Sequence, residues 1–237
     1  MKANPRYRSR PSLHAPLFGA ARAGAALLLA ALACAPAFGA EWQSLFDGRD
    51  VSAWRVLGKP ADAPVRWAIE DGALAGRKGS GNLATKASYG DFELELEWKI
   101  SPGGNSGILF RVDPAAARPP MSGPELQVLD DAAHKDGKSP LTSAGALYAL
   151  YPPAKAAARP VGEWNALRLR VQGGRVQSWL NGQLVVEAEI GSADWNARVA
   201  QSKFAKAPQF GRAAAGLIVL QDHGDPVWYR KIRIRTL

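Results

Sequence analysis

The sequence predicts an all-β protein, a single β-sandwich that follows an N-terminal export signal. Three observations support this fold class. Apolar and polar residues alternate with a period of two in several segments, glycine-containing turn signals separate those segments, and helical periodicity is weak outside residues 192–204. A period of two returns strand side chains to the same face. Many such strands joined by turns are typical of a sandwich.

Residues 1–40 differ in kind from the rest of the chain. Five basic residues precede or flank an alanine-rich apolar stretch at 23–33, and no acidic residue occurs before Glu41. This is the layout of a secretory signal, and small residues at 35–39 offer two cleavage positions. The apolar stretch is too short for a membrane span. We therefore predict a signal peptide over 1–40, a periplasmic or secreted protein, and one domain over 41–237.

Cys34, the only cysteine, lies inside this leader. A lipoprotein signal also ends at a cysteine but prefers leucine three places earlier, where this chain has Ala31. Lipid anchoring through Cys34 is therefore the minor alternative. If cleavage follows Cys34, the mature chain has no disulfide, and its stability comes from core packing.

The formal charge of +9 does not predict a nucleic-acid partner. Without the five basic residues of the leader, 25 Lys and Arg face 21 Asp and Glu, a formal charge of +4. These charges are scattered, and the C-terminal segment KIRIRTL alternates basic and apolar residues as a surface strand does. We expect no nucleic-acid binding and no membrane span.

Regular alternation marks the individual strands. Segment 92–98 opposes four apolar residues to three glutamates, and segment 165–171 opposes apolar residues to two arginines: Phe92, Leu94, Leu96 and Trp98 against Glu93, Glu95 and Glu97, then Leu167, Leu169 and Val171 against Arg168 and Arg170. Asn181-Gly182 predicts a tight hairpin between strands within 176–189. Trp98 and Trp179 are expected in the core, and 192–204 is expected to hold a turn or two of helix. Loops 113–124 and 131–159 are unusually long, as functional loops often are.

The segment 123–131, GPELQVLDD, carries polar side chains within a short apolar run. In a strand, Glu125 and Gln127 face one way while Leu126 and Val128 face the other. The polar side is either a solvated outer face or a floor on which a ligand sits.

Segment 105–111, NSGILFR, adds candidates for the same face. By parity, Asn105 and Arg111 can project beside Glu125 and Gln127. An arginine beside a carboxylate is most simply a salt bridge. Together, however, these side chains also supply the planar donors and acceptors that sugar hydroxyls need.

His223 is the remaining candidate for acid–base chemistry. Asp222 and Asp225 bracket it, so it is either a general base tuned by a carboxylate or a turn residue. Two separated histidines beyond the leader do not form a dedicated zinc site, and no GxSxG elbow indicates a hydrolase triad.

Nine segments in order resemble the 3-keto-disaccharide hydrolase domain family, which has a concanavalin-A-like jelly-roll sandwich. They span Trp42 to the C-terminus: FDGRDVSAW, DFELELEWKI, GGNSGILFR, ELQVLD, GALYALYPP, GEWNALRLRV, WLNGQLVVE, SKF and LQDHGDPVWYRKIRI. One departure is Lys231, where the resemblance leads us to expect Asn in the final strand. The resemblance implies a saccharide-binding concave sheet with GPELQVLDD as one floor strand.

The related β-glucanases of this architecture carry a Glu-x-Asp-x-x-Glu strand. At the same spacing this chain has Glu125, Gln127 and Asp130, so the middle carboxylate is an amide and the last one is shorter. The usual two-carboxylate retaining mechanism is therefore not supported.

The resemblance implies cleavage of 3-keto-glycosides, in which a base removes the proton at C2 and an acid protonates the leaving oxygen. Glu125 or His223 is the expected base and Asp130 or His223 the acid, with Arg111 and Asn105 as donors to the enolate. Gln127 and, from the motifs, Tyr148, Lys203 and Gln221 are the expected substrate contacts. The last three also admit structural roles: a core hydroxyl, a surface charge and a strand hydrogen bond.

Two alternatives stay open. A carbohydrate-binding module of the same fold needs no acid or base, and the presence of Glu125, Asp130 and His223 favours the enzyme. No cofactor is required, yet a divalent cation such as Ca²⁺ could be held by a group of four carboxylates: Glu125, Asp130, Asp131 and Asp136.

Overall fold

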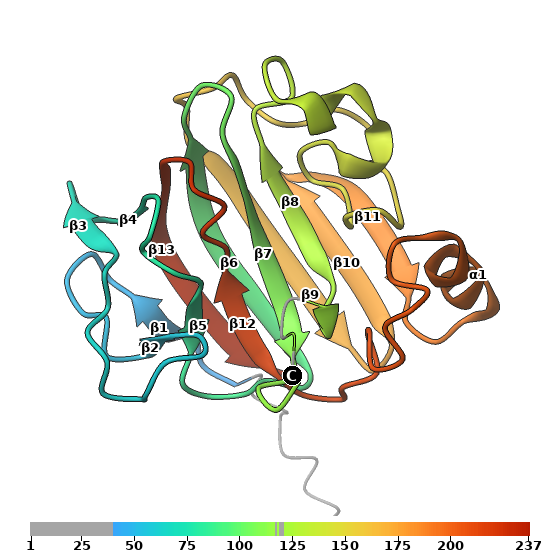
Figure 1. The fold of residues 1–237 in the computed structure, drawn as a ribbon, viewed down its shortest axis with the longest axis horizontal. Coiled ribbons are helices and arrows are strands. Elements are labelled where there is room, and N and C mark those ends of the chain that lie inside the picture. Colours follow the sequence, from blue (N-terminus) through green and yellow to red (C-terminus); the bar gives the residue numbers. More distant parts are fainter. Residues whose placement is uncertain (1–39, 117, 119–120) are drawn as a thin grey trace, which may run out of the picture. The chain divides into compact units, whose positions relative to one another are not determined.

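The computed structural model describes residues 40–116, 118 and 121–237 as two antiparallel sheets packed face to face (Figure 1). Residues 1–39 of the expected signal peptide, with Cys34, lie outside the described residues. No described helix combines the length and apolar character that crossing a membrane requires. The all-β sandwich predicted from the alternating segments is confirmed.

The larger sheet has eight strands. Its spatial order is β11 (Gln183–Glu189), β10 (Arg175–Leu180), β9 (Asn165–Gln172), β6 (Phe92–Ile100), β13 (Val227–Thr236), β4 (Ala73–Gly76) and β3 (Ala68–Glu70), with β1 (Gln43–Phe46) also paired to β13. The five-stranded sheet has the order β2 (Trp54–Val56), β5 (Leu83–Thr85), β12 (Leu217–Leu220), β7 (Asn105–Val112) and β8 (Glu125–Leu129).

The inner faces of the two sheets form the main core. Apolar side chains of β6 and β9 pack with those of β7, β8 and β12: Phe92, Leu94, Leu96, Trp98, Leu167, Leu169, Val171, Ile108, Phe110, Leu126, Val128, Ile218 and Leu220. The predicted inward faces of segments 92–98 and 165–171 are therefore confirmed. The prediction for Trp179 is wrong: Val176, Ser178 and Leu180 of β10 point inward, so Trp179 lies half-buried on the outer face.

Left-handed residues define two local features of the large sheet. Asn181 and Gly182 have φ angles of 50° and 78°, as the predicted hairpin between β10 and β11 requires. In β13, Lys231 has a φ of 51° beside a shift in register with β6 between Arg230 and Arg233. This is a β-bulge, and its left-handed position suits asparagine, the residue expected there from the family pattern.

Two long connections lie beside the strands that they join. The β8–β9 connection carries the 3-10 helices η2 (Lys135–Lys138) and η3 (Pro140–Thr142), and the β11–β12 connection carries α1 (Ala193–Gln201) (Figure 1). Ser192 caps α1 by accepting a hydrogen bond from the Trp195 backbone N–H, and the predicted helix is confirmed. Tyr151, Trp195, Phe210 and Phe204 stack in sequence across the two connections. They thereby fix the segment that contains Lys203.

Candidate functional site

A polar group on the outer face of the five-stranded sheet is organised around Gly107. The register pairs Gly107 with Gln127 of β8, and the backbone N–H of Gln221, just after β12, donates to the Gly107 carbonyl at 2.9 Å. Gln127 and Gln221 therefore flank Gly107 on adjacent strands. Glu125 shares the Gln127 face. The outward polar side of GPELQVLDD and the inward position of Leu126 agree with the alternation of the segment.

The Glu125 side chain lies across Gly107. A methyl group added there would come within 2.7 Å of Glu125 Cδ and would overlap its carboxylate oxygen. Only glycine leaves this space free. The backbone thus holds one carboxyl group flat against the sheet.

Burial raises the pKa of Glu125 to about 7, which the Lys203 ammonium partly counteracts and Asp136 reinforces. The Lys203 residue is exposed as a whole, yet partial desolvation of its ammonium group lowers its pKa. The carboxylates of Glu125 and Asp136 act in the opposite direction and raise it. A carboxyl group that titrates near neutrality beside an ammonium is typical of acid–base sites.

Tyr148 joins this group from the β8–β9 connection. Its backbone N–H donates to the Glu125 carbonyl at 2.9 Å, and its hydroxyl lies 3.4 Å from Asp136 Oδ2. Lys203 Nζ lies 4.1 Å from the centroid of the Tyr148 ring, a cation–π contact. Burial, followed by the nearby carboxylates Asp136 and Glu125, raises the pKa of Tyr148, so its phenol is protonated at neutral pH. The predicted contacts Tyr148 and Lys203 therefore lie together with Glu125.

Two buried amide oxygens have no donor among the described residues. Gln127 Nε2 donates to the Thr142 carbonyl at 3.1 Å, which fixes the amide, and Gln127 Oε1 is buried without a partner. Gln221 Oε1 is buried without a partner as well. A buried acceptor without a hydrogen bond lowers the free energy of unfolding. Each oxygen is therefore expected to accept a hydrogen bond from a hydroxyl group, such as a protonated carboxyl or a sugar hydroxyl.

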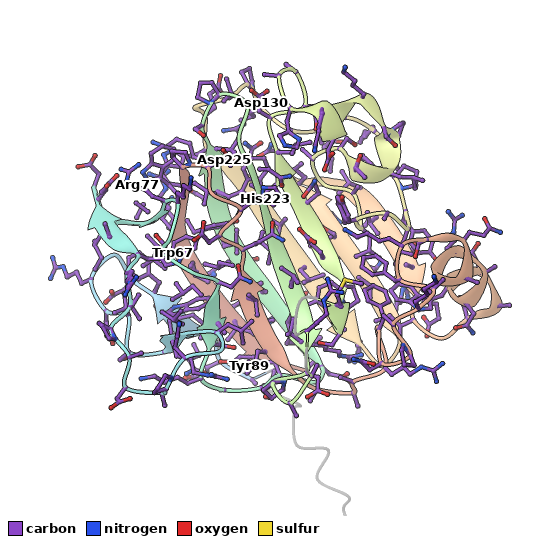
Figure 2. All side chains as sticks on the ribbon, viewed as in Figure 1. Trp67, Arg77, Tyr89, Asp130, His223 and Asp225 are labelled. Carbon is purple, nitrogen blue, oxygen red and sulfur yellow. The ribbon has the colours of Figure 1, made fainter. Side chains whose placement is uncertain are left out.

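His223 is exposed in the β12–β13 connection, at the end of the sheet where Figure 2 also labels Asp130 and Asp225. No hydrogen bond or ion pair joins its ring to Asp222 or Asp225. Asp222 accepts the backbone N–H groups of Gly81 and Gly224, and Asp225 accepts that of Asn105 at 3.1 Å. The interpretation of His223 as a base tuned by a flanking carboxylate is therefore not supported.

The ring that does approach His223 belongs to His134, with the centroids 6.4 Å apart and the planes nearly perpendicular. His134 Nδ1 accepts a hydrogen bond from the Asp136 backbone N–H at 3.1 Å, so in the neutral ring Nε2 carries the proton. Sequence reasoning did not assign His134 to the site. The signal that was available is that His134 and His223 are the only histidines outside the leader.

Asp130 has a local structural role. Its carboxylate accepts the Gly103 backbone N–H at 2.8 Å and the Ala132 backbone N–H at 3.1 Å, which fixes the turn before β7. Protonation would disturb these bonds. The predicted role of Asp130 as an acid is not supported by this geometry.

Arg111 lies away from Glu125, contrary to the parity argument. Its φ of 48° marks a β-bulge, where Leu109 pairs with Val219 but Val112 pairs with Leu217. The extra residue turns the guanidinium toward the other sheet, where it donates to the carbonyls of Gly90 and Gly173 and pairs with Asp91. Asn105 keeps the parity of Gly107 and is nearly buried.

The described residues contain no group of three or more histidine, cysteine, aspartate or glutamate side chains arranged to hold a metal ion. Asp131, one of the four carboxylates expected to converge, accepts the backbone N–H of Ala144 at 2.8 Å. Cation binding stays a prediction.

The chain is similar to known proteins over most of its length. The model of the 3-keto-alpha-glucoside-1,2-lyase-like domain matches residues 41–235. A protein of Bacteroides thetaiotaomicron named 3-keto-disaccharide hydrolase is 34% identical, over 82% of this chain and 78% of its own. A Parabacteroides distasonis protein proposed to be a glycosyl hydrolase has a crystal structure with a TM-score of 0.76 and 32% identity, covering 83% of this chain and 94% of its own.

A more distant Bacillus subtilis protein with a galectin-like fold has 13% identity and a TM-score of 0.54, and covers 83% of this chain and 94% of its own. This likeness supports the jelly-roll sandwich alone. The family match covers every described strand except the last residue of β13. The chain belongs to the 3-keto-alpha-glucoside-1,2-lyase-like domain family.

Proposed function

We propose that this protein is a glycosidase that cleaves the glycosidic bond of 3-keto-glycosides, including 3-keto-disaccharides. The observation that carries the proposal is Glu125, a carboxyl group with a pKa of about 7 held across Gly107 and close to Lys203. The relative named 3-keto-disaccharide hydrolase supports the substrate class.

A ketone at C3 makes elimination the accessible route. A base removes the proton at C2, the electron pair forms an enolate, and the C1–O bond breaks as the leaving oxygen gains a proton. Water then adds across C1 and C2, with its hydroxyl on C1 and a proton on C2. The net change is hydrolysis, and each step needs a proton donor or acceptor near neutrality.

Glu125 suits the proton transfer at C2, because a pKa near 7 lets it accept the proton and return it during hydration. Lys203 takes the place proposed earlier for Arg111 as the cation that stabilises the enolate. The amide oxygens of Gln127 and Gln221 accept sugar hydroxyls. His223, with His134 beside it, is the second proton donor. We further propose that this chemistry takes place after export, in the periplasm or outside the cell.

The test compares a 3-keto-disaccharide with its unoxidised parent sugar. We expect monosaccharide release from the keto sugar alone, and a roughly hundredfold to ten-thousandfold lower rate in Glu125→Gln. Glu95→Gln is the matched control, because Glu95 lies on the outer face of the other sheet and pairs with Arg233. Substrate deuterated at C2 should react more slowly or exchange its label with water. Equal rates in Glu125→Gln and the native protein would refute the assignment.

The alternative is a carbohydrate-binding module. Such a protein would bind both sugars and release a monosaccharide from neither. This outcome of the same incubation would reject the enzyme and keep the saccharide-binding face.

A further inference from the structure

A second feature lies on the opposite side of the sandwich, on the outer face of the eight-stranded sheet. A groove of about 1060 Å³ is lined by residues of β1, β6, β9, β10 and β13 and of the segments next to them. We call it the large-sheet groove. None of the residues assigned to the Glu125 site lines it, so the groove is independent of the proposed function.

The charged side chains in and beside the large-sheet groove form two layers, one of carboxylates and one of cations. Glu93, Glu95 and Glu97 follow one another along β6, and each pairs with cations of β9 or β13: Arg168, Arg230, Lys231, Arg233 and Arg235. The three carboxylate side chains are 0%, 30% and 22% exposed, whereas the five cationic side chains are 30–67% exposed. The carboxylates therefore lie deep and the cations face the solvent, with an excess of one positive charge once Asp47, which also lines the groove, is counted.

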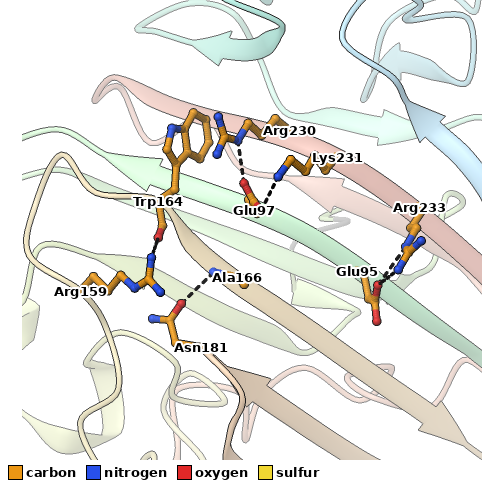
Figure 3. Close-up of polar contacts among 9 residues, drawn as sticks. All are labelled: Glu95, Glu97, Arg159, Trp164, Ala166, Asn181, Arg230, Lys231 and Arg233. Carbon is orange, nitrogen blue, oxygen red and sulfur yellow. Dashed lines mark hydrogen bonds and ion pairs between the residues drawn. The ribbon is translucent and has the colours of Figure 1, made fainter.

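Figure 3 shows how the β13 bulge adds to this layer. Arg230 Nε and Lys231 Nζ both reach Glu97, at 2.6 and 2.8 Å, because the bulge places two consecutive residues on the same side. Arg233 donates to Glu95 from Nε and Nη2, and its Nη1 has no acceptor among the described residues. Arg168 Nε is buried and also lacks one.

Half-buried tryptophans hold the guanidinium groups in place. The Arg233 guanidinium carbon lies 4.6 Å from a Trp42 ring centroid, that of Arg230 3.9 Å from Trp164, and that of Arg168 5.0 Å from Trp179. Stacking of this kind fixes the plane of the guanidinium before any ligand arrives. The groove thus presents preorganised planar cations beside large apolar rings.

We propose that the large-sheet groove binds an anionic polysaccharide, a chain whose sugar rings carry carboxylate groups. Guanidinium groups donate to carboxylates in paired geometry, and partly buried indole rings offer apolar surface to the C–H faces of sugar rings.

The test measures binding of polygalacturonate through quenching of tryptophan fluorescence and by affinity electrophoresis. We expect binding that weakens as salt rises, and at least tenfold weaker binding of the methyl-esterified polymer, which has the same backbone without charge. The double variant Lys231→Asn with Arg233→Gln should bind roughly tenfold more weakly and with a smaller salt dependence.

The matched control removes two exposed cations elsewhere, in Lys155→Gln with Lys206→Gln, and should change the affinity less than about twofold. Glycoside cleavage should be unchanged in both double variants. Absence of binding, or equal loss in the two double variants, would overturn the proposal. A DNA oligonucleotide that binds as tightly as polygalacturonate, with the same loss in the groove variant, would overturn the assignment to a saccharide.

Discussion

At the scale of single residues, the site depends on a glycine, a position where no side chain occupies the space above the sheet. Gly107 lies between Gln127 of β8 and Gln221, which follows β12, and the Glu125 carboxyl group occupies the space above it. Alternation within 123–131 was enough to predict that Glu125 and Gln127 share a face. The contact with Gly107 could not be predicted, because the connection 113–124 between the two strands is too long for a turn type to fix their register.

We expect Gly107→Ala to displace the Glu125 carboxyl group. The added methyl group would cost roughly 1–3 kcal/mol of unfolding free energy and should lower the rate of glycoside cleavage more than tenfold. Gly90→Ala is the control, since its methyl group would meet nothing closer than the Ala214 carbonyl oxygen at 3.4 Å. Chemical denaturation and steady-state kinetics measure both effects. Native activity in Gly107→Ala would show that the position of Glu125 is not set by this contact.

The raised pKa of Glu125 also predicts a dependence of stability on pH. The folded protein holds the proton more tightly than the unfolded chain, whose value is near 4.5, so the stabilisation is complete below about pH 4.5 and is lost as pH rises to about 7. The loss is at most about 3 kcal/mol. In Glu125→Gln this contribution should vanish. Denaturant unfolding of the two proteins at pH 5 and pH 8 gives the difference, and parallel pH profiles would contradict the assignment.

At the scale of elements, strands were predictable and their irregularities were not. Alternation located β6, β9 and the β10–β11 hairpin, because one face of each is apolar. It failed at Arg111, since a bulge inverts the parity of the residues that follow while leaving their composition unchanged. The prediction also failed at Trp179, because the Arg168 side chain covers this aromatic ring and so allows it to lie on an outer face instead of in the core.

The bulge at Lys231 gives a prediction at the same scale. Lys231→Asn should keep the free energy of unfolding within about 0.5 kcal/mol, because asparagine tolerates the left-handed backbone and offsets the loss of the exposed contact with Glu97. Lys231→Val should lose more than about 1 kcal/mol, since a β-branched residue is strained at this φ. Thermal unfolding of both variants checks the order, and the reverse order would show that the ion pair dominates.

At the scale of the whole described sandwich, Arg111 ties one sheet to the other through polar contacts. Its guanidinium extends from β7 to the Gly90 and Gly173 carbonyls at the ends of β6 and β9. The site, in turn, draws on three strands and two long connections. The site residues Tyr148, in 131–159, and Lys203, in 202–204, could be predicted only from the family motifs. Long loops have no periodicity from which the positions of their side chains could be inferred.

Arg111→Leu should therefore act on stability and leave catalysis intact. Removing the guanidinium leaves the Gly90 and Gly173 carbonyls without its hydrogen bonds and leaves Asp91 with only the Gly173 backbone N–H, and this should cost about 2–4 kcal/mol. Turnover per folded molecule, measured well below the melting temperature, should stay within about threefold of the native value. A Michaelis constant raised tenfold at unchanged stability would instead place Arg111 against the substrate.

The order of strands has a consequence for how the protein is made. The last two strands of the chain occupy interior places, β12 between β5 and β7 and β13 between β6 and β4. A chain that lacks residues 217–236 therefore has neither sheet complete, because both halves of each sheet require a central strand from this segment. Neither sheet can close before residues 217–236 have joined it, so a fragment that ends before residue 217 should not reach the folded state.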